Sequence, residues 1–285
     1  MEKVAFLNLT YNSFNRNDLW DKFFKSGDKD SFNLYIHPKS KEENIFSDFF
    51  IENTVETDWG QFSLVEATIE LMKAALQDEE NEYFSLISHA HLPLYDLDTT
   101  VDLIKKGYKN TTFAKHFSFF TKVKSQLVLR EGVINHPFDQ YNAVCQFFLC
   151  RRKEVEAFVE SFEEYSRYFV KNKVIFADEF YFWAVSRELK MNFKIGQATT
   201  YSDWSIRRVS GNKIERNPRW FHKFDDHMLN RYRKANYIYV RKIEKTTMVD
   251  TNPFQDQKTL DSSLKDFKIH LEDEKFSRTI RPLRK

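Results

Sequence analysis

Glycine is the residue that this sequence most clearly lacks. The 285 residues include six glycines, at positions 27, 60, 107, 132, 196 and 211, and the closest two are 211 − 196 = 15 residues apart. Loops that cradle phosphates with backbone amides need two or three glycines within a few residues. The sequence therefore excludes a Walker A loop and a G-x-G-x-x-G dinucleotide loop, so any nucleotide phosphate has to be held by side chains.

Cysteine is also scarce. The two cysteines, Cys145 and Cys150, flank residues 146–149. An extended strand would hold them too far apart for a disulfide bond, so we expect two reduced thiols in the core. Neither cysteine lies in a nucleophile motif and no serine has the G-x-S-x-G context, so covalent acyl transfer is not indicated.

Long apolar runs and an excess of one charge are missing as well. No apolar run approaches the ~18 residues of a membrane span, and Met1–Leu7 shows neither a basic region nor a small-residue cleavage site. We therefore expect a cytoplasmic protein with no membrane span, a composition still compatible with peripheral membrane contact. The formal net charge of +2 demands no polyanionic partner, so no nucleic acid is expected.

Apolar side chains, in contrast, are plentiful. Hydrophobic residues make up 41% of the chain, which is enough to fill the core of one large domain. We expect this domain over residues 1–245. Residues 246–285 are polar, carry charges of both signs and are expected to form a C-terminal arm or tail.

The first elements in chain order predict an α/β fold. Residues 3–10 have the pattern of a strand, an apolar helix follows the expected cap Asn17-Asp18 and ends at Gly27, and residues 32–38 form a second strand. A strand, helix and strand at this spacing indicate a parallel unit, whose ligands collect at the carboxyl ends of the strands. The residues at that rim should be 9–12 and 36–39.

The later pattern continues with helices and strands. Ser63 and Glu66 have the spacing of a capping box at the start of a core helix. Strands are expected over residues 83–88, 146–151, 193–195, 199–204 and 237–243, and a helix from Asp98 to about Lys106. One long helix is expected from an apolar seam with a period of about 3.5 residues, formed by Val155, Phe158, Phe162, Tyr165 and Phe169.

The acid pair Asp178-Glu179 is followed directly by four aromatic residues, at positions 180–183. A carboxylate at the first turn of a helix is common because the free amides there favour negative charge, and this explains Asp178 as a cap. Aromatic neighbours partly desolvate a carboxylate, which is one way to make a general base. Glu179, which has no capping role to explain it, is therefore the candidate base.

Two other clusters have alternative explanations. Asp96 and Asp98 form a D-x-D pair of the kind that binds a divalent metal in many sugar-nucleotide transferases, although a turn and a helix cap explain the pair at least as well. His89 and His91 could share a zinc ion, but no acidic or cysteine partner lies nearby in the sequence. Hydrogen-bonded histidines at the rim of the sheet are the simpler interpretation.

The order of short motifs resembles one enzyme family, the Core-2/I-branching β-1,6-N-acetylglucosaminyltransferases of glycosyltransferase family 14, especially its plant-like members of unassigned acceptor. The resemblance covers roughly residues 3–245. It rests on Val4 to Thr10, Leu19 to Phe24, Tyr35 to Pro38, Trp59 to Ala67, Ser88 to Leu94, Gln146 to Arg152, Asp178-Glu179, Asp203-Trp204-Ser205 and Val240-Arg241-Lys242.

This resemblance implies a GT-A-type fold, which is a Rossmann-like mixed sheet flanked by helices, and an inverting reaction. The donor would be a UDP-sugar, with N-acetylglucosamine as the first candidate, and the acceptor a glycan hydroxyl. No divalent metal and no other cofactor is expected, because Arg219 and Lys242 would hold the diphosphate. Glu179 would be the catalytic base, and Trp204 and Asp178 would bind the acceptor. The uridine would lie at the first two strand ends, against Asn8, Thr10, Asn12, His37 and Pro38.

The sequence also departs from the family. Ala177 stands where a proline usually precedes the acid pair, and neither the membrane anchor nor the disulfide cysteines of the Golgi members are expected from this sequence. Two alternatives follow from the weighed motifs. The first is a metal-dependent UDP-sugar transferase that uses Asp96 and Asp98, and the second is a non-catalytic glycan-binding protein on the same fold.

Overall fold

A computed structural model of the chain describes residues 2–107, 111–114, 144–171, 173–191, 193–196, 198–204, 207–209, 213–215 and 218–254. Its centre is a six-stranded sheet with the order β2-β1-β3-β6-β5-β7. The strands are β1 (Lys3–Thr10), β2 (Phe32–Pro38), β3 (Asn81–Ser88), β5 (Thr111–Ala114), β6 (Leu149–Arg151) and β7 (Phe193–Gly196). β1 pairs in parallel with β2 and β3, whereas β6 runs antiparallel to β3 and β5.

The central strand β1 is buried on both faces. Ala5, Leu7 and Leu9 point into one core cluster, and Val4 and Phe6 point into another. A strand that is covered on both sides is expected to be almost continuously apolar, which explains the run Val4–Leu7 in the sequence.

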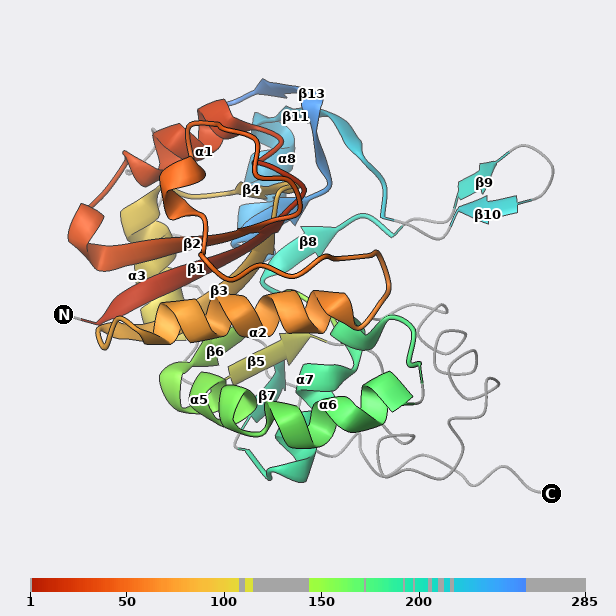
Figure 1. Cartoon of the computed structure of the whole chain (residues 1–285). Coiled ribbons are helices and arrows are strands. Elements are labelled where there is room, and N and C mark those ends of the chain that lie inside the picture. The colour runs from red at the N-terminus through yellow and green to blue at the C-terminus, as the bar shows by residue number, and fades with distance from the viewer. Residues whose placement is uncertain are drawn as a thin grey trace.

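Helices cover the first face of the sheet (Figure 1). They are α2 (Ser63–Leu76), α5 (Arg152–Glu160), α6 (Phe162–Lys171) and α7 (Tyr181–Glu188). Their apolar side chains and those of β1 and β3 form one core cluster, in which Phe158, Phe169 and Tyr181 are fully or almost fully buried. Burying a side chain of this size contributes roughly 1.5–3 kcal/mol, so this layer holds the segment from η4 to α7 against the sheet.

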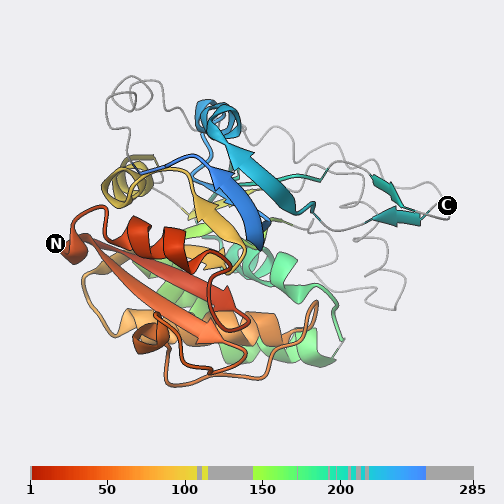
Figure 2. The ribbon, with the colours of Figure 1, turned by 90° about the horizontal axis from the view of Figure 1, so that it is seen from above.

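The second face carries helices and a second, smaller sheet (Figure 2). The helices are α1 (Asn17–Phe24), α3 (Leu97–Gly107) and α8 (Asp226–Lys234), and the sheet has the order β4-β12-β8, with β4 (His91–Pro93), β12 (Tyr239–Arg241) and β8 (Thr200–Ser202). β11 (Phe221–Asp225) and β13 (Ile243–Asp250) pair in parallel beside α8. The remaining elements are the short helices η1 (Lys29–Ser31), η2 (Ser47–Phe49) and η4 (Ala177–Glu179) and the hairpin β9 (Arg207–Val209) and β10 (Lys213–Glu215).

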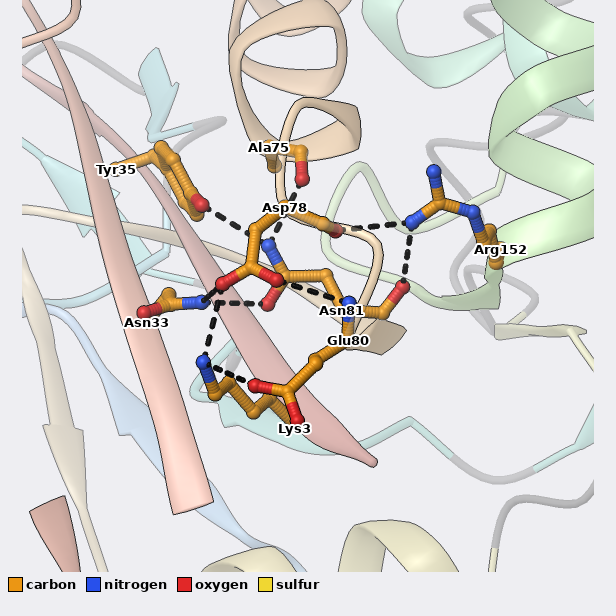
Figure 3. A network of polar contacts seen from close by, with 8 residues as sticks. All are labelled: Lys3, Asn33, Tyr35, Ala75, Asp78, Glu80, Asn81 and Arg152. Carbon is orange, nitrogen blue, oxygen red and sulfur yellow. Dashed lines mark hydrogen bonds and ion pairs between the residues drawn. The ribbon is translucent and has the colours of Figure 1, made fainter. Parts of the chain in front are cut away.

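A polar network closes the amino edge of the parallel strands (Figure 3). The Lys3 ammonium lies 3.1 Å from Asp78 Oδ2 and 2.7 Å from Glu80 Oε2. The Asn81 amide nitrogen donates to the Tyr35 hydroxyl at 2.9 Å and to the Ala75 carbonyl at 2.8 Å. Arg152, at the start of α5, donates to the carbonyls of Leu76, Asp78 and Asn81. The network ties the first three parallel strands to α2 and α5.

This architecture confirms the expected α/β class, with a mixed Rossmann-like sheet flanked by helices, and agrees with a GT-A-type fold. Both cysteines are buried and form no disulfide bond, as expected, and burial raises the pKa of Cys145 to about 11. No helix within the described ranges is both long and apolar enough to cross a membrane.

Several local predictions were wrong. Ser63 does not cap α2, because its hydroxyl instead accepts from the Asp58 amide at 3.0 Å. Arg16, and not Asn17 or Asp18, occupies the cap position of α1. The expected long helix is two helices, broken at Ser161, whose hydroxyl donates to the Ala157 carbonyl at 2.6 Å. Such a back-bond competes with the helical pattern and often bends it.

The end of the folded region also differs in detail from the pattern. The strand expected over residues 237–243 is divided at Lys242 into β12 and β13. The predicted boundary at residue 245 lies inside β13, which continues to Asp250. Val249 and Phe254 pack against the second core cluster. Residues 255–285, most of the predicted tail, lie outside the described part of the chain.

Candidate active site

The loops that leave β1, β2, β3 and β12 are joined to one another by backbone hydrogen bonds. The His89 amide donates to the Leu9 carbonyl at 3.2 Å, and the Lys39 amide donates to the Thr10 carbonyl at 2.9 Å. The Ile243 amide donates to the Ala90 carbonyl at 2.9 Å. The carboxyl ends of these strands therefore form one connected edge, where an α/β sheet usually binds its ligands.

The acid pair Asp178-Glu179 lies in η4, a single 3-10 turn directly before α7, and not in the first turn of that helix. Both side chains are half-buried. The four aromatic residues behind them, Phe180 to Trp183, are all buried in the first core cluster. They anchor the turn to the core, while the Val144 amide donates to the Glu179 carbonyl at 2.9 Å and holds it from the other side.

Arg241 is half-buried and carries a positive charge that interacts with this acid pair. In the smaller sheet it lies between His91 of β4 and Ser202 of β8. Its guanidinium carbon lies 4.4 Å from the centroid of the Phe147 ring. Its Nε is buried and has no hydrogen-bond partner within the described residues.

The charge of Arg241 in β12 interacts with the carboxylates of Asp178 and Glu179. Burial lowers the pKa of Arg241 to about 10, and Cys145, Glu179 and Asp178 act in the opposite direction. A buried guanidinium nitrogen without a hydrogen-bond partner, such as the Nε of Arg241, is costly. The carboxylates of η4 offset part of that cost and are themselves close to a fixed cation.

The predicted phosphate ligands Lys242 and Arg219 lie on neighbouring segments. The Lys242 ammonium lies 5.0 Å from the centroid of the Trp220 ring, and the Lys242 carbonyl accepts from the Phe221 amide at 2.8 Å. The Arg219 amide donates to the Asp203 carbonyl at 2.8 Å, and its guanidinium lies 3.8 Å from the Asp203 carboxylate. Trp204, the predicted acceptor residue, follows Asp203 directly and is half-buried. The structure thus brings Arg219, Lys242 and Trp204 to one place.

His89 lies among these cations. Burial, together with the positive charges of Arg241, Lys242 and Lys245, lowers the pKa of His89 to about 4. A histidine with such a pKa is neutral at pH 7. His89 therefore adds no charge to a region whose positive potential comes from Arg241, Lys242 and Lys245.

His91 is buried and hydrogen-bonded at one ring nitrogen. Its Nδ1 accepts from the Ser88 amide at 3.0 Å and lies 2.9 Å from the Ser88 hydroxyl. An Nδ1 that accepts from an amide leaves the proton of the neutral ring on Nε2, and this Nε2 has no partner within the described residues. No cluster of three or more potential metal ligands occurs in the part of the chain that the structure describes.

The residues predicted at the uridine site lie at the ends of β1 and β2. Asn8 is fully buried, and neither side-chain polar atom has a hydrogen-bond partner in the described ranges. The Thr10 hydroxyl donates to the Ser13 carbonyl at 2.7 Å, and Thr10 pairs with Pro38. Asn12 donates to Glu42 at 3.2 Å. His37 is buried, and its Nε2 accepts from the Val55 amide at 3.0 Å.

The two carboxylates of the D-x-D pair serve different partners. Asp96 is buried and accepts from the amide and the hydroxyl of Thr99, at 2.8 and 3.0 Å, which is the geometry of a cap on α3. Asp98 is exposed and accepts from the Asp28 amide at 2.8 Å. Hydrogen bonds to separate partners direct the two groups away from a shared cation.

Sequence reasoning missed Arg241 as a site residue. The sequence contained a clue to Arg241, because a charged residue within the apolar strand pattern of residues 237–243 is unusual. Lys242 drew attention through the family motif. Successive residues of a strand point to opposite faces, so the structure was needed to show that Arg241 is the one beside the acid pair.

Comparison by sequence matches the chain to a protein family and to a plant protein. A profile of the family described as Core-2/I-Branching enzyme matches residues 4–233. A protein of Oryza sativa subsp. japonica named Glycosyltransferase BC10 is 28% identical over 169 residues, which are 56% of this chain and 41% of the rice protein. The chain thus matches less than half the length of that relative.

A solved structure of a glycosyltransferase involved in the glycosylation of the major capsid of PBCV-1 is also similar. The similarity covers 70% of this chain and 84% of that chain, with a TM-score of 0.38 and 9% sequence identity.

Proposed function

Because the chain belongs to the Core-2/I-branching enzyme family, we propose that it is an inverting glycosyltransferase. It would move a sugar, with N-acetylglucosamine as the first candidate, from a UDP-sugar to a hydroxyl of a glycan. The observation that carries the proposal is the charge interaction between the acid pair in η4 and the cation Arg241, which precedes Lys242 at the end of β12.

In this proposal Glu179 is the general base. It accepts the proton of the acceptor hydroxyl while the oxygen forms a bond to the anomeric carbon of the donor sugar. The bond from that carbon to the diphosphate breaks, and its electron pair leaves with UDP. Attack from the face opposite the leaving group inverts the anomeric configuration, and a positioned base of this kind contributes roughly 10²- to 10⁴-fold to the rate.

The leaving diphosphate needs positive charge, which Arg219 and Lys242 would supply. A guanidinium can bind phosphate oxygens in bidentate fashion, and an ammonium acts as a point charge. We add Arg241 to this set, because its half-buried guanidinium contributes a charge in a region of reduced dielectric, where charge acts more strongly than in water. Trp204 and Asp178 would contact the acceptor, and the ends of β1 and β2 would hold the uridine.

The proposal gives no role to a divalent metal. This part of it is supported by the hydrogen bonds of Asp96 to Thr99 and of Asp98 to Asp28, which occupy the pair that a metal-dependent transferase would use. We also keep the cytoplasmic location expected from the sequence, which fractionation of the source cells would test.

A screen of UDP-sugars for turnover, with and without EDTA, tests the proposed function. Wild type should consume at least one UDP-sugar equally well in EDTA, and Glu179→Gln and Lys242→Ala should both be strongly impaired. Loss of turnover in EDTA would favour the metal-dependent alternative. A wild-type protein that is inert toward every UDP-sugar would favour a glycan-binding protein without catalysis.

A further inference from the structure

Trp59 is a tryptophan whose indole ring is mostly exposed to solvent. It lies in the loop between η2 and α2, and its side chain is 73% exposed, the highest value among the exposed large hydrophobic residues in the described ranges. Trp20 and Trp183, in contrast, are 0% and 8% exposed. Since burial of an aromatic side chain is favourable, an indole left in water calls for an explanation beyond folding.

The ring of Trp59 is in contact with the segment that carries the acid pair. Its centroid lies 5.2 Å from that of Phe176, in an edge-to-face arrangement. The Phe176 amide donates to the Gly60 carbonyl at 2.7 Å, and the Phe176 carbonyl accepts from the Glu179 amide at 2.9 Å. One ring contact and two backbone hydrogen bonds therefore connect Trp59 to Glu179.

The Trp59 loop is also held in place from both ends. Lys39, directly after β2, donates to the Thr57 carbonyl at 2.6 Å and lies 3.3 Å from the Asp58 carboxylate. Gly60 has a φ of +74°, and a Cβ at this position would lie 3.3 Å from the Phe176 ring. The exposed ring is thus part of a fixed turn, which lowers the entropy cost of binding a ligand against it.

We propose that Trp59 is an acceptor-binding residue, whose exposed face stacks on the C–H face of a neutral pyranose ring in the glycan that Glu179 deprotonates. This inference rests on the proposed function. A pyranose ring has an apolar face of C–H groups and a rim of hydroxyls, so it needs an aromatic surface with polar neighbours. Asp58 and Gln61, on either side of the Trp59-Gly60 turn, are exposed and polar.

The surroundings argue against other occupants. A protein or membrane partner would require a larger apolar patch, whereas the neighbours of Trp59 in the chain are polar or buried. The diphosphate of the donor would be held by cations on other elements, at the end of β12 and before β11. The acceptor is the substrate that must approach Glu179 directly, and Trp59 is joined to Glu179 through Phe176.

Three neutral β-linked disaccharides, lactose, cellobiose and N,N′-diacetylchitobiose, serve as probes. Their binding to the full chain is measured by titration calorimetry for wild type, Trp59→Ala and Trp59→Phe. Phe49→Ala is the matched control, since Phe49 is an exposed aromatic residue, 42% exposed, whose ring contacts Phe46 and not Phe176.

Wild type should bind at least one probe, and Trp59→Ala should weaken that binding about three- to tenfold, as expected for the loss of one aromatic stacking contact. Trp59→Phe should retain part of the affinity, and Phe49→Ala all of it. In transfer assays the ratio of the acceptor KM to the UDP-sugar KM should rise in Trp59→Ala.

Equal affinity of wild type and Trp59→Ala, or wild-type binding to none of the three probes, would overturn the inference. A rise in the UDP-sugar KM alone would also overturn it and would assign the ring to the donor. The proposed function fails by a different result, the absence of UDP-sugar turnover in wild type, so the two failures can be told apart.

Discussion

Two buried asparagines at opposite edges of the central sheet have contrasting environments. Asn81, at the amino end of β3, donates to Tyr35 and Ala75 and accepts from Asn33. Asn8, near the carboxyl end of β1, is equally buried, but neither side-chain polar atom has a hydrogen-bond partner in the described ranges. A buried amide without partners costs free energy, so Asn8 is explained poorly by stability.

Two arginines show the same contrast. Arg152 donates to three backbone carbonyls at the amino edge, whereas the buried Nε of Arg241 has no partner among the described residues. Unsatisfied atoms also occur elsewhere, for example in Thr100 and Glu154, so one such atom does not identify a site. A half-buried cation that interacts with two carboxylates is more specific. Under the proposed function, the amino edge serves stability and the carboxyl edge serves binding and catalysis.

Glu179→Gln should have the largest effect at the carboxyl edge. The amide cannot accept the acceptor proton, so transfer should fall by about 10²- to 10⁴-fold. The midpoint of urea unfolding should stay near the wild-type value, because Glu179 is only half-buried. A variant that keeps wild-type turnover would remove Glu179 from the mechanism.

Replacement of Arg152 and Arg241 tests the contrast between the amino edge and the carboxyl edge directly. Arg241→Met should lower turnover by roughly 10²- to 10³-fold, the usual cost of losing one electrostatic contact in an active site. Its free energy of unfolding should change little, because Asp178 and Glu179 are half-buried and stay in contact with solvent once the cation is removed. Arg152→Met should do the reverse, with lower stability and full activity, measured by urea unfolding and UDP-sugar turnover. Equal stability losses in the two variants would contradict the division between the edges.

Substitution of Asn81 and Asn8 tests the same contrast through stability alone, with a smaller expected effect. Asn81→Leu leaves the Tyr35 hydroxyl and the Ala75 carbonyl without their partner and should destabilise the protein by about 1–3 kcal/mol. Asn8→Leu removes an amide that has no partner, so the free energy of unfolding should stay the same or rise. Urea unfolding of both variants measures this difference. A large fall in the free energy of unfolding of Asn8→Leu would show that Asn8 contributes to stability.

The pH dependence of stability should show the half-buried His89 at the carboxyl edge. The pKa of His89 is about 4 in the folded chain, against 6.5 ordinarily. Between these values the unfolded chain binds a proton that the folded chain does not, so stability is full above pH 6.5 and falls as the pH approaches 4. From pH 7 to pH 5, His89→Gln should lose about 2 kcal/mol less stability than wild type. Identical losses would mean that His89 titrates normally.

The sequence was informative wherever a residue's role depends on its neighbours in the chain. Alternation and the proline at residue 38 predicted β1 and β2 with the correct bounds, because strand periodicity is a local property. The scarcity of glycine directed attention to side chains as the possible phosphate ligands, and this assignment stays a prediction. The acid pair followed by aromatic residues identified a turn that the structure anchors in the core and places next to Arg241.

The sequence failed where distant residues compete for the same group. The Ser63 hydroxyl binds Asp58 and not its own helix, and the back-bond of Ser161 ends a helix that the apolar seam would have continued. Exposure of Trp59 could not be predicted, because its loop is placed by contacts with Lys39 and Phe176, far away in the chain. Long-range contacts of this kind decide which polar and aromatic groups remain available to a ligand.

Titration calorimetry of UDP in the presence of EDTA tests most directly whether the carboxyl edge is a metal-free nucleotide site. Wild type and Asn81→Leu should bind UDP with similar affinity, whereas Lys242→Ala and Arg241→Met should each bind at least about tenfold more weakly, the loss expected from one charge-assisted phosphate contact. No binding of UDP to wild type in EDTA, or equal binding by all four proteins, would contradict the assignment.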